Sequence, residues 1–246
     1  MTMRFDILTL FPEMIEAVLG DSIIGRAREK GIIEINCVQI RDFAFNKHRQ
    51  VDDYPSGGGT GMVMQAQPIF DAYNSVCEGL DYKPETIYLS PQGKTFRQGT
   101  AKRLSKKKHI VLICGHYEGV DQRVLDEIVD SEISLGDFVL TGGEIAAMAV
   151  VDATARLVSG VLKSEDSFSE ESHFNGLLEY PQYTRPEEWR GKKVPEILLS
   201  GHHKNIMAWK REMSILNTFK KRRGMLSKAN LSEKEREFVK KLKSEE

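Results

Sequence analysis

No stretch of this 246-residue sequence is long and apolar enough to cross a membrane, which takes about 18 to 20 residues. Its apolar N-terminal segment is interrupted by Asp6 and lacks the small-residue cleavage site of an export signal. Cysteine is scarce: Cys37, Cys77 and Cys114 are far apart and form no CxxC pair, so neither a disulfide framework nor a cysteine zinc site is predicted. We expect a cytoplasmic protein with no membrane partner and with these thiols in its core.

The common nucleotide-binding motifs are also missing. No GxGxxG sequence opens a predicted helix, and no GxxxxGK[ST] sequence is present. The one dense glycine run, Gly57 to Gly61, lacks the Lys-Ser/Thr pair and follows a polar segment instead of a hydrophobic strand. A phosphate-binding P-loop is therefore not predicted. Two interpretations of this run remain: a flexible loop, or a lid or RNA-contact loop. The adjacent KHRQ segment at 47–50 slightly favours the second.

Composition and charge indicate a folded chain with an uneven charge distribution. Hydrophobic residues make up 40% and charged residues 29%, with 8 prolines and 20 glycines, which excludes disordered and collagenous classes. The net charge of -1 excludes a uniformly basic nucleic-acid binder. However, 22 basic and 30 acidic residues precede His202, while 13 basic and 6 acidic residues lie from His202 onward. The neutral total therefore hides a basic C-terminal part.

Hydrophobic patterning predicts an α/β domain with a mostly parallel sheet flanked by helices, followed by a small helical domain. We expect strands at 3–10, 32–40, 85–90 and 109–114, and helices at 11–19, 67–80, 95–107, 120–129 and 144–158. The strand at 32–40 alternates polar and apolar residues, so one of its faces should be less buried. The expected boundaries are an α/β domain at 1–158, a mobile linker rich in Ser and Glu at 159–179, and a helical domain at 180–246.

Two patterns give detail in the helical domain. Ile206, Trp209, Met213 and Leu216 recur at helical spacing and predict an apolar stripe on one helix face. Ser232 and Glu235 have the spacing of a capping box, which predicts the start of a last helix.

Three loops that contain glycine each follow a predicted strand: SPQG at 90–93, CGHYEG at 114–119 and LGDFVLTGGE at 135–144. Open α/β sheets bind ligands beyond the carboxyl ends of parallel strands, and glycine lets the backbone approach a ligand closely. One such loop is commonly just a turn. Three in succession predict one binding cleft.

The same loops carry a family resemblance. NKHRQVDDYPSGGGTGM, YLSPQG, CGHYEGVDQR, SLGDFVLTGGE, EDSF, GLLEYPQYTRP and GHHKNIMAWK occur in the order seen in bacterial tRNA (guanine-N1)-methyltransferases of the SPOUT class, which the chain resembles along nearly its whole length. The resemblance implies a trefoil-knotted α/β domain that binds S-adenosylmethionine. It also implies a homodimer whose active site is shared between subunits. Pattern alone could not indicate a knot, because unknotted connections are the default.

The resemblance also assigns the binding residues. The cofactor-binding residues it implies are Tyr88, Leu89, Ser90, Pro91, Gly115, Tyr117, Glu118, Gly119, Leu135, Gly136, Asp137, Phe138, Val139, Leu140, Gly142 and Gly143. The tRNA-binding residues it implies are Gly59, Glu179, His202, His203, Lys210 and Arg211. Glu118 could meet the ribose hydroxyls or the cationic end of the cofactor, or be a solvated loop acid.

For catalysis, the resemblance implies that Asp166 removes the N1 proton of a guanine 3′ of the anticodon and that Arg156 stabilises charge on its O6. From composition alone, Asp166 would be a solvated acid in an acidic linker, and Arg156 a cap on a helix dipole. Magnesium assists the family's activity, but the sequence indicates no ligands for it. Two alternatives stay open: a related knotted enzyme that methylates a ribose 2′-hydroxyl, and a non-catalytic RNA-binding protein with a nucleotide-shaped pocket.

Overall fold

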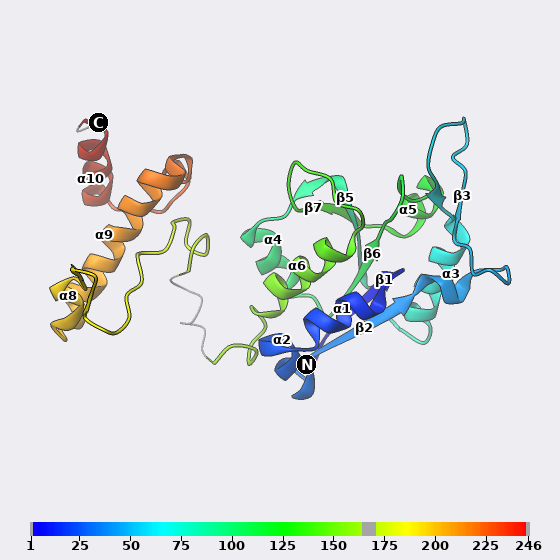
Figure 1. The fold of residues 1–246 in the computed structure, drawn as a ribbon, viewed down its shortest axis with the longest axis horizontal. Coiled ribbons are helices and arrows are strands. Elements are labelled where there is room, and N and C mark those ends of the chain that lie inside the picture. The colour runs from blue at the N-terminus through cyan, green and yellow to red at the C-terminus, as the bar shows by residue number, and fades with distance from the viewer. Residues whose placement is uncertain (1, 164–170, 245–246) are drawn as a thin grey trace. The chain divides into compact units, whose positions relative to one another are not determined.

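The computed structural model describes residues 2–163 and 171–244 (Figure 1). The chain divides into two compact units, Met1–Lys163 and Ser164–Glu246. In the part of the chain that is described, no helix combines the length and the apolar character that a membrane crossing requires.

A five-stranded parallel sheet forms the centre of the first unit, in the order β2-β1-β6-β5-β7. The strands are β1 (Met3–Thr9), β2 (Ile33–Gln39), β5 (Glu85–Thr95), β6 (His109–Cys114) and β7 (Ser131–Ser134). The predicted α/β class with a mostly parallel sheet is confirmed. The less buried face of β2 is confirmed too, because Ile33 and Ile35 are buried while Glu34 and Asn36 are exposed.

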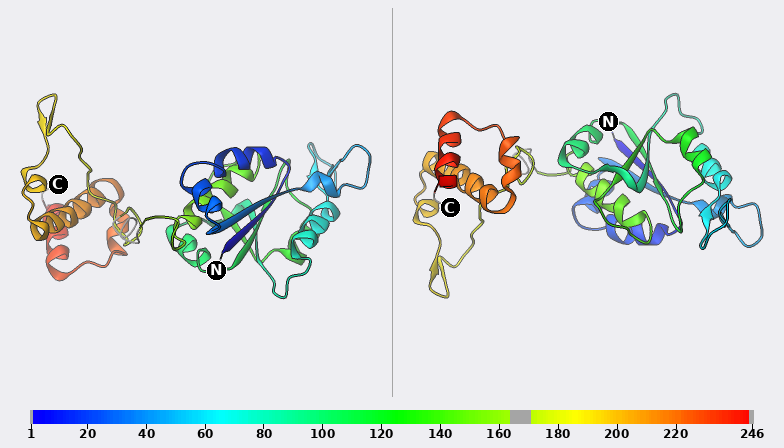
Figure 2. Two further views of the ribbon diagram at one scale, coloured as in Figure 1. Left: turned by 90° about the horizontal axis from the view of Figure 1, so that it is seen from below. Right: turned by 90° about the horizontal axis from the view of Figure 1, so that it is seen from above.

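Helices cover both faces of this sheet (Figure 2). One face packs against α1 (Pro12–Leu19), α2 (Ser22–Glu29), α4 (Gln98–Leu104) and α6 (Glu144–Ala155). The other packs against α3 (Ala66–Cys77), α5 (Gln122–Ile128) and the short 3-10 helix η1 (Ile40–Phe43). Along β6, Leu112 points into the first core and Val111 and Ile113 into the second. This alternation requires apolar residues throughout a central parallel strand.

Helix α2 is absent from the predicted elements. Its sequence contains Gly25, which lowers helix propensity by about 1 kcal/mol relative to alanine. In the structure a Cβ at Gly25 would lie 2.3 Å from the carbonyl oxygen of Gly20 at the end of α1. Gly25 therefore allows two consecutive helices to turn tightly on one another, a packing requirement that helical periodicity does not reveal.

Between η1 and α3 the chain forms a small hairpin from β3 (Asp52–Asp53) and β4 (Val63–Met64). The glycine run Gly57 to Gly61 lies in the loop of this hairpin, which stands away from the sheet (Figure 1). The hairpin is anchored at its base, because Gln65 donates its backbone N–H to the carbonyl of Val51 (2.7 Å).

The second unit contains a hairpin, β8 (Glu188–Trp189) and β9 (Lys192–Lys193), and the helices α8 (Glu196–Leu199), α9 (His203–Arg222), η2 (Arg223–Ser227) and α10 (Glu233–Ser244). Its core holds Leu177, Ile215, Phe219, Leu226, Leu231 and Val239. The predicted capping box is confirmed: Ser232 N–H donates to the Glu235 carboxylate (2.7 Å), and Glu235 N–H donates to the Ser232 hydroxyl (3.4 Å).

The buried face of α9 is not the predicted stripe. Ile215 and Phe219 are buried, whereas Ile206, Trp209, Met213 and Leu216 are only half-buried. At about 100° per residue, these two residues together with the buried Ser214 and Thr218 are centred roughly opposite the stripe. Leu226 and Val239, which come later in the chain, pack on the Ile215 side and decide which face is buried. Trp209 of the stripe contacts the Tyr183 ring, with the two ring centroids 6.4 Å apart.

The Glu235 carboxylate joins α10 to α9. Arg211 donates from Nε to it at 2.7 Å, and this bond is the largest cause that lowers the pKa of Glu235 from an ordinary 4.5 to about 2. A lowered folded pKa gives stabilisation that is complete above the unfolded pKa and is lost as the pH falls through the folded pKa.

We therefore expect Glu235→Gln to destabilise the folded chain near neutral pH by a few tenths to about 1 kcal/mol, the range for partly exposed ion pairs. The difference from the wild type should shrink as the pH falls from about 5 toward 2, because protonation then removes the same interaction. Thermal unfolding at stepped pH measures this. Glu237→Gln, an exposed site on the same helix, should show no such dependence. A pH-independent deficit in Glu235→Gln would contradict the ion-pair explanation.

Candidate functional site

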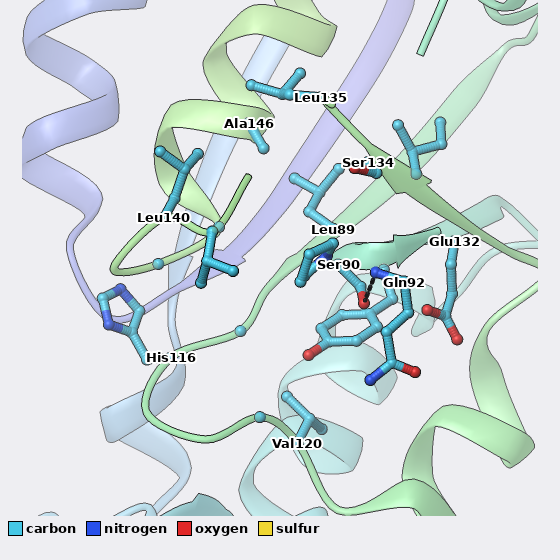
Figure 3. A pocket seen from close by; sticks show the side chains of 18 of the residues that line it. Leu89, Ser90, Gln92, His116, Val120, Glu132, Ser134, Leu135, Leu140 and Ala146 are labelled. Carbon is cyan, nitrogen blue, oxygen red and sulfur yellow. Dashed lines mark hydrogen bonds between the residues drawn. The ribbon is translucent and has the colours of Figure 1, made fainter. Parts of the chain in front are cut away.

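A cavity of about 300 Å³ lies beyond the carboxyl ends of β6 and β7 and beside residues 88–92 in the middle of β5 (Figure 3). Its walls are the three segments singled out in the sequence. The predicted residues that line it are Tyr88, Leu89, Ser90, Pro91, Gly115, Tyr117, Glu118, Gly119, Leu135, Phe138, Val139, Leu140, Gly142 and Gly143. Gly136 and Asp137 belong to the third loop but do not line the cavity. The structure thus brings the predicted loops to one place.

The first wall is the middle of β5, because residues 90–93, predicted as a loop after a strand, lie within β5 in the structure. Ser90 is nearly buried, and its hydroxyl accepts a hydrogen bond from the backbone N–H of Gln92 (3.1 Å). Tyr88 is also buried, and burial raises the pKa of its phenol to about 12, so it stays a neutral hydroxyl at physiological pH. The next residues cross over β7: a Cβ at Gly93 would lie 2.5 Å from the backbone of Glu132 and Ile133. This wall is therefore uncharged and packed backbone against backbone.

The second wall, after β6, is held in an unusual backbone conformation. Tyr117 has φ of 59°, a left-handed value uncommon for a residue other than glycine. The loop is tied to the base of the β3–β4 hairpin, because Glu118 N–H donates to the Met62 carbonyl (2.9 Å) and Met64 N–H donates to the Gly119 carbonyl (2.9 Å). Such strain persists only where neighbouring contacts hold it, and it is concentrated at functional sites.

The hairpin also touches the side chain of Glu118. A Cβ at Gly61 would lie 2.6 Å from the Glu118 side chain, and Gly61 has φ of 91°. The positive φ therefore favours glycine at this position, and a side chain there would displace that of Glu118. The glycine run therefore ends against the second wall of the cavity, next to the Glu118 side chain.

The third wall, after β7, presents apolar side chains to solvent. Phe138 is 55% and Val139 is 81% exposed, which is high for large apolar residues. The wall is joined to the second one by a backbone hydrogen bond from Gly143 N–H to the Gly115 carbonyl (2.9 Å). A Cβ at Gly143 would lie 2.7 Å from the Cα of Cys114, so only glycine allows this approach.

Sequence reasoning missed a buried polar network behind these walls. The Glu144 carboxylate is 2% exposed; it accepts a hydrogen bond from the Thr9 hydroxyl (2.7 Å) and lies 2.7 Å from Nε2 of His116. His116 itself lines the cavity, and its ring packs on Phe11 with centroids 5.0 Å apart. The network joins the ends of β1 and β6 to the first turn of α6. Both residues lie inside the motifs that the sequence analysis quoted, but nothing in their spacing shows that they pair.

Of the two residues expected to act in catalysis, Arg156 lies within the described residues and Asp166 does not. Arg156 is half-buried and forms the C-cap of α6, where its backbone N–H donates to the Asp152 carbonyl (3.2 Å). Asp166 lies outside the described residues. Its position relative to the cavity is therefore an expectation from the family resemblance only.

The predicted tRNA-binding residues lie in both units. Gly59 is exposed in the loop of the β3–β4 hairpin, and His202 and His203 are exposed at the start of α9. The Lys210 ammonium lies over the Tyr180 ring, 4.6 Å from its centroid. Arg211 is engaged with Glu235 and with the Asn230 carbonyl, so its guanidinium contributes to the packing of α9 on α10.

Glu179 is held against α9 through its backbone. Its carbonyl accepts a hydrogen bond from the Asn217 side chain (2.7 Å), and its N–H donates to the Ser172 hydroxyl (2.9 Å).

Within residues 2–163 and 171–244 no group of three or more His, Cys, Asp or Glu side chains is arranged to hold a metal ion. The structure therefore lends no support to the magnesium expectation.

Known proteins are similar to this chain along nearly its whole length. The family model for tRNA (guanine-1)-methyltransferase TrmD matches residues 3–228. A tRNA (guanine-N(1)-)-methyltransferase from Ruminiclostridium cellulolyticum is 58% identical over 92% of this chain and 97% of its own length. Proteins of the same name from Alkaliphilus oremlandii and Clostridium perfringens are 53% and 56% identical over 98% of this chain and 99% and 100% of their own lengths. The chain therefore belongs to the tRNA (guanine-1)-methyltransferase family.

Proposed function

We propose that this protein transfers the methyl group of S-adenosylmethionine to N1 of the guanine 3′ of the anticodon in tRNA. The observation that carries the proposal is the single cavity in which the three quoted loops of a tRNA (guanine-1)-methyltransferase family member meet. Ligand sites of open α/β sheets lie at such strand ends. In keeping with a role in tRNA modification, we place the protein in the cytoplasm.

The cavity has the chemistry that the methyl donor needs. Its volume of about 300 Å³ is at the lower end of the range for small-molecule sites, which combine apolar walls with a few fixed polar groups. Leu89, Leu135 and Leu140 provide apolar surface for an adenine ring, and the glycine backbone provides hydrogen bonds. Glu118 is the acidic side chain that we assign to the ribose hydroxyls or the cationic methionine end.

We expect Gly143→Ala to weaken binding of S-adenosylmethionine by about five- to 150-fold. The added Cβ would lie 2.7 Å from the Cα of Cys114, and such overpacking costs about 1 to 3 kcal/mol, of which each 1.4 kcal/mol is a factor of ten. Isothermal titration calorimetry measures the affinity.

Gly99→Ala, in α4, is the matched control because nothing lies within 4 Å of its Cβ position. If Gly143→Ala bound the donor as tightly as Gly99→Ala, the close approach of the two loops would not shape the donor site.

In the proposed mechanism the protein supplies a base and a cation. N1 of guanine carries a proton at neutral pH, so it becomes nucleophilic only when that proton leaves, and we assign its removal to the Asp166 carboxylate. Negative charge then develops on O6, and we assign its stabilisation to the Arg156 guanidinium. The remaining contribution is alignment of the donor methyl group with N1.

The second unit is proposed to bind the tRNA, because its part from His202 onward carries 13 basic and 6 acidic residues. Neutralising phosphates accounts for most sequence-independent affinity for RNA and makes it depend on salt. The assigned contacts in this unit are Glu179, His202, His203 and Lys210, and Gly59 of the first unit is assigned a further contact. Arg211 is also assigned an RNA contact, which it would make while it keeps its hydrogen bonds to Glu235.

A knotted fold and a homodimer with a shared site complete the proposal. The dimer is supported by an apolar face on the first unit: Phe11, Met14 and Val18 recur on one side of α1 and are 45%, 41% and 56% exposed, and Ile145 on α6, a helix that contacts α1, is 46% exposed. Exposed large apolar side chains gathered on two neighbouring helices favour an interaction site. A chain that stays monomeric at assay concentrations and is fully active would contradict the shared site.

One assay separates the proposed activity from its alternatives. Purified protein is incubated with labelled S-adenosylmethionine and unmodified tRNA, and the product is digested and analysed by mass spectrometry. We expect 1-methylguanosine at the position 3′ of the anticodon. A ribose-methylated nucleoside would indicate the related knotted enzyme. The absence of donor binding in calorimetry, with tRNA binding retained, would indicate the non-catalytic RNA-binding protein.

A further inference from the structure

The hairpin β8–β9 has two chemically different faces. It pairs Glu188 with Lys193 and Trp189 with Lys192, and directly opposed residues of an antiparallel pair share a face. Glu188 and Lys193 therefore lie on one face, where their charged ends are 4.0 Å apart. Trp189 and Lys192 lie on the other face, which Glu187, two residues before Trp189, continues below the strands.

The turn adds a second cation to the Trp189 face. The Arg190 guanidinium lies over the indole ring, 5.0 Å from its centroid, in the range of a cation–π contact. Arg190 and Gly191 have φ of 50° and 75°, the paired positive values of the tight turn whose twist matches that of its strands. The pairing continues below the strands, because Val194 N–H donates to the Glu187 carbonyl (2.8 Å). The face is thus presented by a short, well-defined hairpin.

The hairpin projects from the rest of its unit (Figure 2, yellow). Trp189 is 59% exposed, and none of residues 187–193 is buried. An exposed indole is costly to leave in water, and none of the predicted roles uses Trp189. Together the ring and the two cations form the combination that binds an unpaired nucleotide: a flat apolar surface for the base and positive charge for its phosphate.

We propose that the face formed by Trp189, Arg190 and Lys192 binds an unpaired nucleotide of the tRNA by stacking, an inference that rests on the proposed function for the identity of the RNA. Charge favours RNA over an apolar protein partner, because residues 185–194 contain four basic and two acidic side chains. Base-on-aromatic stacking tolerates any base, so this contact adds affinity without selecting a sequence.

The test is the affinity of the full-length chain for unmodified tRNA. Stacking contributes about 1 to 3 kcal/mol per base, so Trp189→Ala should weaken binding by about five- to 150-fold. Trp189→Phe keeps a flat ring and should recover most of that loss. Lys192→Ala should weaken binding more than Lys193→Ala, which removes the same charge from the opposite face. The affinity for S-adenosylmethionine should be unchanged in every variant.

A spectroscopic readout reports the contact directly. The chain has two tryptophans, so Trp209→Phe leaves Trp189 as the sole indole. Titration of that variant with tRNA should quench its fluorescence. The proposal is overturned if Trp189→Ala binds tRNA as tightly as the wild type, or if the indole signal does not change on binding.

Light scattering on the same samples tests whether a second copy of the chain, and not tRNA, covers this face. If Trp189→Ala reduced the molecular mass and lost tRNA affinity only through that dissociation, the face would belong to a second copy of the chain and the proposal would be wrong. A failure of the proposed function gives a different result: a wild-type chain that neither binds S-adenosylmethionine nor methylates tRNA. The tRNA affinities of the hairpin variants are measured independently of donor binding and methylation, so the two failures can be told apart.

Discussion

Replacing Asp166 with Ala is expected to lower the rate of methyl transfer by about 10²- to 10⁴-fold, the usual contribution of a general base. The N1 proton must leave before the nitrogen can accept a methyl group, and the variant has no carboxylate to accept it. The affinities for S-adenosylmethionine and for tRNA should stay within a few-fold of the wild type, because only the base is removed. Single-turnover kinetics at saturating donor separate this chemical step from binding.

The neighbouring acid provides the control for this prediction. Glu165 precedes Asp166 in the same acidic run, so Glu165→Ala removes a carboxylate of the same charge from the adjacent position. If the run acts only as a solvated acidic segment, the two substitutions should have equal and small effects. Turnover in Asp166→Ala that equals turnover in Glu165→Ala would remove Asp166 from the proposed mechanism.

The architecture around the cavity follows from features that are local in the sequence. The apolar residues of 109–114 predict a central strand because both faces of a parallel sheet are covered, and β6 is buried along its whole length. A glycine-containing loop after each of three strands predicts a cleft because the carboxyl ends of parallel strands lie at one edge. The predicted loops meet there without any knowledge of strand order.

What the sequence could not provide depends on contacts between distant residues. Thr9 and Glu144 are 135 positions apart, and their hydrogen bond exists only because β1 ends beside the first turn of α6. The buried face of α9 was wrongly predicted for the same reason. Its own periodicity allowed the Ile206 stripe, but the later residues Leu226 and Val239 bury the opposite side. Spacing within one element cannot report which side another element covers.

Arg156 presents a case in which one residue can have two separable effects. It forms the C-cap of α6, where a basic side chain stabilises the helix dipole by about 0.3 to 1 kcal/mol, and it is also the proposed partner of the developing charge on O6. A capping effect alone would lower the melting temperature of Arg156→Ala and leave its turnover, measured well below that temperature, close to the wild-type value.

Loss of a preorganised charge at the reacting oxygen predicts a different result: a fall in turnover of Arg156→Ala by about 10²- to 10³-fold with little change in donor affinity. Arg156→Lys distinguishes the two effects further. It keeps the positive charge at the end of α6 and so should keep the stability, but its ammonium lacks the planar fork of the guanidinium and should restore only part of the turnover. A variant whose only defect is weaker binding of S-adenosylmethionine would place Arg156 in the donor site and not beside the guanine, because stabilisation of a developing charge acts on the transition state and leaves the bound donor unaffected.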